Sequence, residues 1–225
     1  MPGLLSVVAT PIGNLEDITL RALRILKEAD VIACEDTRVT GQLLKHYEIE
    51  KPLLPVHQHT TDGVLEKICA RIQAGERVAY VSDAGTPGVN DPGGKLVAHV
   101  AEAGLTIEVI PGSSALTAAM SVCGFPMERF RYVGFIPHKN GKQALLRAIA
   151  EDEQPVVFFE STHRILKTLE QLKASYSETR LIFVGRELTK KFETLYRGTI
   201  DEVLGALQAS DTRGEFVVIT APSRL

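Results

Sequence analysis

The stretch Ser82-Asp-Ala-Gly-Thr-Pro-Gly-Val-Asn-Asp-Pro-Gly-Gly94 decides how this chain is organised. It holds four glycines and two prolines in thirteen residues, whereas a strand-to-helix connection usually needs about 2–6 residues. Glycine lets the backbone approach a ligand and adopt positive φ, while proline stiffens the loop. An apolar run at 78–81 precedes this loop and a helical pattern at 94–103 follows it. We therefore expect a preformed cradle for a small molecule at the end of a strand.

Strand and helix patterns alternate on both sides of this loop in the first half of the chain. Short apolar, β-branched runs predict strands at 4–9, 31–33, 53–56, 78–81 and 106–110. Helical spacing of apolar residues predicts helices at 20–26, 39–47, 62–73 and 94–103. Short strands separated by helices indicate an α/β fold with a mostly parallel sheet and helices on its faces.

The second half shows a different pattern. Strands are predicted at 131–136, 156–159, 181–184, 194–197 and 215–219, with helices near 140–150, 164–175 and 201–209. Because some of these strands follow one another closely, we expect a mixed sheet with antiparallel pairs. The predicted domains are residues 1–115 and 116–225, joined through a helical segment from Ser113 to Val122.

Two further loops rich in Gly, Pro and Ser follow predicted strands: Thr10–Asn14 and Pro111–Ala115. Open α/β sheets bind ligands at the carboxyl ends of their strands, so the three loops together predict a polar ligand site. Known nucleotide motifs do not fit it. Gly88 and Gly93 have Walker A spacing, but Leu96 occupies the position of the Mg²⁺-binding hydroxyl.

Charge and cysteine content narrow the classes of partner. The net charge of −3 is not that of a protein that binds RNA through overall basicity. Residues 1–112 carry 10 basic and 15 acidic residues, and residues 113–225 carry 15 and 13. Any RNA contact is therefore expected on local basic surface of the second half. The candidate basic residues are Lys139, Lys142, Arg147, Lys190, Lys191 and Arg197, with Tyr132, Phe192 and Tyr196 as aromatic candidates.

Three scattered cysteines, no signal peptide and no long apolar run predict a cytoplasmic protein without membrane contact. His57 and His59 share a face if they lie in a strand, but no third ligand cluster accompanies them, so we expect no metal.

Five segments occur in an order and spacing that resemble one family. They are Ala9-Thr-Pro-Ile-Gly-Asn-Leu-Glu-Asp-Ile18, Cys34-Glu-Asp-Thr-Arg38, the 82–93 loop, Glu160-Ser-Thr-His-Arg164 and Arg186-Glu-Leu-Thr-Lys190. Together they resemble the tetrapyrrole-methylase superfamily, and within it the branch that methylates ribosomal RNA. The resemblance implies a two-domain fold with S-adenosylmethionine in the cleft between the domains. It also implies a homodimer and 2′-O-methylation of a cytidine in the 16S rRNA decoding region of the 30S subunit.

Members of this family usually continue with a further small helical segment. Since this chain ends at Leu225, the resemblance implies that the segment is missing, shortened or removed, which bears on RNA affinity.

The resemblance also implies which residues contact the cofactor. Asp83 has an alternative role as an acceptor for local backbone N–H groups, and Phe159 an alternative role in core packing. Ser113 and Ser114 open a helix, where serine is a good N-cap, so we expect them to serve both purposes. The implied cofactor residues are Thr10, Pro11, Ser82, Asp83, Ala84, Gly85, Val89, Ser113, Ser114, Ala115, Phe159 and Glu160.

Methyl transfer from a sulfonium to a hydroxyl is an in-line displacement that depends on alignment and needs no metal. A positioned base or a cation beside the oxygen helps, because a ribose hydroxyl is a poor nucleophile. Candidates in the first half are Glu35, Asp36 and Arg38. We select Asp36 from these, together with Arg186, Glu187 and Lys190 from the second half. Lys190 can act as a base only if burial lowers its pKa.

Two other functions stay open at this point. A methyltransferase of the same superfamily can act on a tetrapyrrole or a diphthamide-type acceptor. The segments Cys34–Arg38 and Arg186–Lys190 count against that reading. A non-catalytic ligand-binding module is the other alternative.

Overall fold

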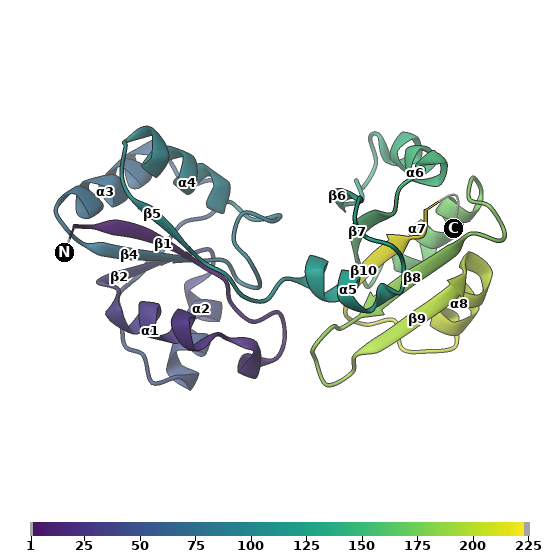
Figure 1. Cartoon of the computed structure of the whole chain (residues 1–225), viewed down its shortest axis with the longest axis horizontal. Helices are drawn as coiled ribbons and strands as arrows, with labels where there is room; N and C mark the ends of the chain where they lie inside the picture. Colours follow the sequence, from purple (N-terminus) through teal and green to yellow (C-terminus); the bar gives the residue numbers. More distant parts are fainter. Residues whose placement is uncertain (1, 223–225) are drawn as a thin grey trace. The chain divides into compact units, whose positions relative to one another are not determined.

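The computed structural model describes residues 2–222 and divides into two compact units, the first ending at Ser114 and the second beginning at Ala115. Each unit has its own sheet (Figure 1). Each also has its own buried hydrophobic side chains. The expected α/β class is confirmed, with a parallel sheet in the first half and a mixed sheet in the second.

The first unit contains a five-stranded sheet in the order β3-β2-β4-β1-β5. Every pair of neighbouring strands in it is parallel, so all five carboxyl ends lie at one edge. Because β1 lies between β4 and β5, the loops that follow these three strands start side by side. The strands are β1 (Leu4–Val8), β2 (Val31–Cys34), β3 (Leu53–Pro55), β4 (Arg77–Val81) and β5 (Ile107–Ile110).

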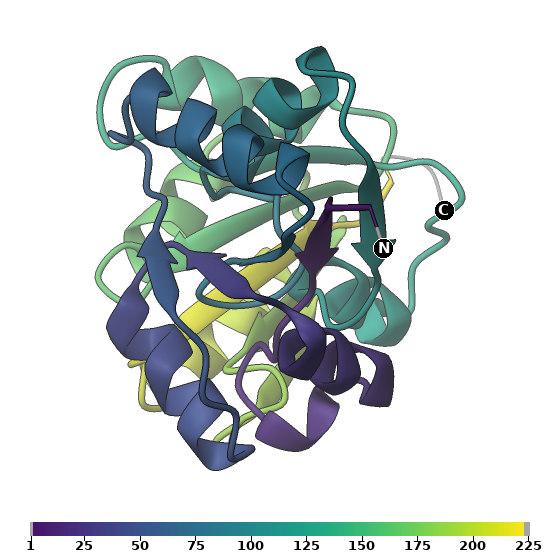
Figure 2. The same ribbon diagram turned by 90° about the vertical axis from the view of Figure 1, so that its left-hand side faces the viewer.

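Helices cover both faces of this sheet, as near-continuous apolar strands require. Helices α1 (Leu20–Glu28) and α2 (Thr37–His46) pack on one face, while α3 (Asp62–Gln73) and α4 (Gly93–Glu102) pack on the other (Figure 2). A short 3-10 helix at Leu15–Asp17 lies in the segment after β1, where no element was expected.

The second unit contains a sheet in the order β6-β7-β10-β8-β9. Only β6 and β7 pair in parallel, and the other three pairs are antiparallel. Its strands are β6 (Arg131–Phe135), β7 (Val156–Ser161), β8 (Leu181–Arg186), β9 (Thr194–Thr199) and β10 (Glu215–Thr220). Its helices are α5 (Ala115–Cys123), α6 (Lys142–Glu151), α7 (Ile165–Lys173) and α8 (Ile200–Gln208).

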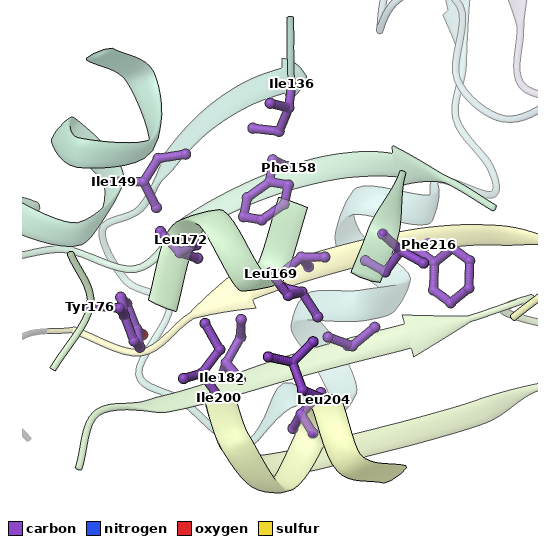
Figure 3. Close-up of a cluster of buried hydrophobic side chains, with 14 of the residues drawn as sticks. Ile136, Ile149, Phe158, Leu169, Leu172, Tyr176, Ile182, Ile200, Leu204 and Phe216 are labelled. Atoms are coloured by element: carbon purple, nitrogen blue, oxygen red, sulfur yellow. The ribbon is translucent and has the colours of Figure 1, made fainter. Parts of the chain in front are cut away.

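Apolar side chains from α6, α7 and α8 meet one face of this sheet in a single core. Phe158 and Ile182 from the strands lie against Leu169, Leu172 and Leu204 from the helices (Figure 3). This core keeps the helices on one side, so the ends of β7 and β8 and the hairpin between β8 and β9 are positioned by a rigid base.

Candidate functional site

Three loops of the first unit meet at the carboxyl edge of its sheet. The backbone N–H of Thr10 donates to the carbonyl oxygen of Gly85, and that of Gly85 donates to Thr10, each at 3.0 Å. The Thr86 hydroxyl donates to the carbonyl oxygen of Ser113 at 3.0 Å. The loops after β1, β4 and β5 are therefore tied together by hydrogen bonds, as their adjacency in the sheet predicts.

Side chains inside these loops stabilise the junction. The Thr10 hydroxyl donates to the carbonyl oxygen of Ser82 at 3.2 Å, and the Ser82 hydroxyl lies 3.3 Å from the carbonyl oxygens of Ala84 and Gly85. Thr10 and Ser82 are both buried. Their side chains are thus used to hold the loop, and only the backbone around them is available to a ligand.

Asp91 shapes the long loop, a role that the sequence analysis did not assign. Its carboxylate accepts the backbone N–H groups of Gly88 at 2.7 Å, Val89 at 3.1 Å and Gly93 at 2.7 Å. The Tyr80 hydroxyl lies 3.4 Å from the same carboxylate. An Asp before Pro in a glycine-rich loop is a known acceptor for nearby N–H groups, so the residue type was the available signal.

Backbone donors in this loop are left for a ligand. Among residues 2–222, the N–H groups of Asp83 and Ala84 donate to no protein acceptor, and both residues are exposed. Gly85 and Gly88 have φ of 79° and 91°, a conformation that L-residues rarely adopt. Free N–H groups on a preformed loop fit the carboxylate and hydroxyl acceptors of a polar cofactor such as S-adenosylmethionine.

The end of β2 joins the same edge through Asp83. The Asp83 carboxylate accepts the backbone N–H of Asp36 at 3.0 Å. Desolvation of its carboxylate by the surrounding loops raises the pKa of Asp83, and the Asp36 carboxylate adds to this effect. The Asp83 carboxylate thus joins the loop after β4 to the end of β2 and does not cap N–H groups of its own loop, and its predicted cofactor contact stays a prediction.

Asp36 is the N-cap of α2, which argues against its predicted catalytic role. Its carboxylate accepts the Arg38 backbone N–H at 2.8 Å and the Arg38 guanidinium at 2.6 Å. Those hydrogen bonds lower the pKa of Asp36 to about 2. A carboxylate with so low a pKa is a weak acceptor for a hydroxyl proton.

Glu35, the neighbour of Asp36, has a different environment. Its carboxylate makes no hydrogen bond or ion pair with any part of the chain that the structure describes. Burial raises the pKa of Glu35, and the negative charges of Asp83, Asp91 and Asp36 raise it further. Glu35 is therefore a half-buried, unpaired carboxylate at the carboxyl edge of the sheet.

The predicted catalytic residues of the second unit form a paired network at the end of β8. Arg186 is buried and donates to the carbonyl oxygen of Arg213 at 2.8 Å. The Lys190 ammonium lies 2.9 Å from both Glu187 and Glu215.

These pairs decide the protonation of Lys190 and Glu187. Partial burial lowers the pKa of Lys190, but the hydrogen bonds to Glu215 and Glu187 outweigh it, so the net shift is upward. Burial raises the pKa of Glu187, but Lys190 and the Glu215 N–H outweigh it and the net shift is downward. Lys190 lacks the lowered pKa that a base role requires.

Phe159 and Glu160 lie on opposite faces at the end of β7. The Phe159 ring packs edge-to-face on Tyr132 and Phe135, with centroids 5.4 and 5.5 Å apart. The Glu160 carboxylate is buried, accepts the Thr168 hydroxyl at 2.8 Å and pairs with Arg164 at 3.1 Å. Both residues have contacts within the second unit, and their predicted cofactor contact stays a prediction.

Lys142 corrects one sequence interpretation. The sequence predicts Lys142, with Lys139 and Arg147, as a surface candidate for RNA contact, but its side chain is buried and its ammonium donates to Thr168 at 3.0 Å. Burial lowers the pKa of Lys142. The residue supports the Glu160 network and is unavailable to phosphate groups.

Residues 2–222 offer neither a metal site nor a membrane-spanning helix. No group of three or more His, Cys, Asp or Glu side chains is arranged to hold a metal ion. Within the same residues, every helix is too short or too polar to cross a membrane.

Comparisons with known proteins place the chain among methyltransferases. The family model for tetrapyrrole (corrin/porphyrin) methylases matches residues 4–204. A ribosomal RNA small subunit methyltransferase I of Synechocystis is 43% identical over 97% of this chain and 79% of that protein. The same-named protein of Thermotoga maritima is 40% identical, covering 96% of this chain and 97% of that protein.

Solved structures show the same fold at low sequence identity. A diphthine synthase matches with a TM-score of 0.75 at 16% identity, covering 97% of this chain and 90% of that one. A Thermus thermophilus uroporphyrin-III C-methyltransferase complexed with S-adenosylhomocysteine matches with a TM-score of 0.65 at 21% identity, covering 97% of each chain.

The two adjacent glycines that close the long loop provide a stability test. A Cβ at Gly93 would lie 2.4 Å from Tyr80 Cε1, whereas a Cβ at Gly94 meets nothing within 4 Å. We expect Gly93→Ala to lower the free energy of unfolding by about 1–3 kcal/mol through overpacking. Gly94→Ala, the matched control, should stay within about 0.5 kcal/mol of the wild type or gain stability. Urea denaturation measures both, and equal stability of the two variants would contradict the described packing.

Proposed function

We propose that this chain, which belongs to the tetrapyrrole (corrin/porphyrin) methylase family, methylates ribosomal RNA of the small subunit. The proposal follows from its relatives, which are named ribosomal RNA small subunit methyltransferase I. The chain is a methyltransferase, and S-adenosylmethionine is its methyl donor. The finer proposal is that the acceptor is the 2′-hydroxyl of a cytidine in 16S rRNA. The single observation that carries the assignment is 40–46% identity over nearly the whole chain.

The loops at the carboxyl edge of the first sheet are the proposed cofactor site. The free N–H groups of Asp83 and Ala84 can donate to the carboxylate or ribose of the cofactor, and the bound cofactor supplies a methyl group activated by a sulfonium. Gly85 provides the positive-φ turn next to these donors, and Val89 offers an apolar contact. Thr10, Pro11, Ser113, Ser114 and Ala115 are proposed to complete this region. Phe159 and Glu160 of the second unit are proposed as further cofactor contacts.

Glu35 is the proposed proton acceptor in place of Asp36. As the new C–O bond forms and the C–S bond of the sulfonium breaks, the hydroxyl proton passes to the Glu35 carboxylate. Two features support Glu35: the carboxylate is unpaired among the described residues, and its raised pKa makes it the stronger base of the two. Arg186, Glu187 and Lys190 are proposed to hold the end of β8 in the conformation in which the second unit contacts the RNA.

Two finer proposals concern assembly and location. The edge strand β6 carries Phe135, which is 54% exposed beside Tyr132 and Phe159. Exposed aromatic residues on an unpaired sheet edge favour association with a second copy, so we propose a homodimer. Because its substrate is part of the ribosome, we propose a cytoplasmic location.

The substrate proposal is tested by labelling. Incubation with S-adenosylmethionine labelled in its methyl group and purified 30S subunits should place label in 16S rRNA. The labelled nucleotide should have a 3′ phosphodiester bond that resists alkaline hydrolysis, because its 2′-oxygen is methylated. Label in a tetrapyrrole or in protein, with none in rRNA, would refute the assignment. If no label is transferred, calorimetry with the cofactor alone distinguishes two cases. Binding of S-adenosylmethionine without transfer indicates a non-catalytic module, and no binding indicates an inactive preparation.

The base proposal is tested with adjacent variants. Glu35→Gln should lower kcat by about 10²–10⁴-fold and leave the affinity for S-adenosylmethionine unchanged. Asp36→Asn is the matched control, because Asn is as good an N-cap as Asp, and it should keep near-normal kcat.

The pH profile gives an independent check. Glu35 accepts a proton only when ionised, so the wild-type rate should fall as the pH drops through a pKa above the ordinary glutamate value. A profile in Glu35→Gln with the same acid limb would show that another group is the base.

A further inference from the structure

The hairpin loop between β8 and β9 presents two side chains to solvent. Residues 187–193 connect the strands, and Lys191 and Phe192 are exposed within that loop. Phe192 is 64% exposed. The Lys191 ammonium lies above the Phe192 ring, 5.6 Å from its centroid. A cation therefore lies over one face of an exposed aromatic ring at the tip of the hairpin.

The loop beneath them is rigid. Leu188 is buried and packs over Gly185. A Cβ added at Gly185 would lie 2.9 Å from the Leu188 Cδ2 atom. The Glu187 carboxylate accepts the Glu215 N–H and the Lys190 ammonium, each at 2.9 Å. The Glu193 carboxylate accepts the Thr189 N–H at 2.6 Å. Lys191 and Phe192 thus take no part in the contacts that hold this loop, and their side chains are exposed to solvent.

The loop also carries backbone strain. Glu187 and Thr189 have φ of 50° and 65°, and a β-branched residue such as threonine is rare in this conformation. The Thr189 hydroxyl is buried and has no partner among the described residues. Strain of this kind persists where the surrounding structure enforces it, and it clusters at functional sites. The Phe192 ring stays exposed, so its burial does not offset the backbone strain of this loop.

We propose that Lys191 and Phe192 dock an unpaired segment of the substrate RNA, with Phe192 stacking on a base and Lys191 contacting a phosphate. The inference rests on the proposed function. It fits the chemistry, because single-stranded RNA is recognised by stacking on aromatic rings together with basic side chains. A stacked base needs an exposed ring, and Phe192 supplies one on a loop that the contacts of Glu187 and Glu193 hold in place.

Neighbouring basic residues have other partners. The Arg197 guanidinium lies over the buried Phe183 ring and donates to the carbonyl oxygen of Val122. Lys190 is paired with Glu187 and Glu215. Lys191 forms no ion pair with another described residue, so its charge is available to a phosphate.

The test compares four variants of the whole chain in the 30S methylation assay. Phe192→Ala should raise the KM for 30S subunits by about 10-fold, while the Kd for S-adenosylmethionine and the melting temperature stay unchanged. Phe192→Trp should restore the wild-type KM, because it keeps the stacking face. Lys191→Gln should reduce the slope of log affinity for 30S subunits against log salt concentration by about 0.7. Lys167→Gln, an exposed lysine of α7, should leave that slope unchanged.

Each other outcome counts against the proposal. An unchanged KM in Phe192→Ala would overturn it. A lowered melting temperature, or a changed oligomeric state by light scattering, would assign the loop to folding or to a contact between copies. If the wild type labels no rRNA, the proposed function itself fails, which is separable because that result does not depend on any variant.

Discussion

The parallel pairing of β1 with both β4 and β5 is the constraint on which the rest of the first unit depends. Parallel strands place their carboxyl ends at one edge, so three loops far apart in the sequence become neighbours. The reciprocal hydrogen bonds between Thr10 and Gly85 then close the junction. Since the polar side chains there are used to hold the loops, the backbone N–H groups are the part left to recognise a ligand.

Electrostatics at this edge separates two adjacent carboxylates. Asp36 accepts hydrogen bonds from Arg38 and is stabilised as an anion, while Glu35 is half buried without a partner. One residue thus begins a helix and the other is available for proton transfer. The difference in pKa arises because the Asp36 carboxylate caps the start of α2, whereas the Glu35 carboxylate lies near the acidic residues of the long loop.

In the second unit, paired charges serve structure. Glu160, Thr168, Lys142 and Arg164 form one connected network, and Lys190 is held between two carboxylates. Residues that look available in the sequence are thus occupied in the fold. The unpaired cation and aromatic ring at the β8–β9 hairpin are the contrast, since the loop below them is rigid and strained.

The sequence by itself determined the order of strands and helices, the two sheet types and the position of the glycine-rich loop, because periodicity and turn residues are local properties. Only the tertiary structure decided which polar groups are free. The Asp83–Asp36 hydrogen bond joins residues 47 positions apart, and the burial of Lys142 depends on Thr168 in another helix. The role of Asp91 is a local one that its residue type could have signalled, because its partners lie within three residues of it. Glu35 as the unpaired carboxylate could not be predicted, because pairing depends on neighbours that the fold, and not the chain order, brings together.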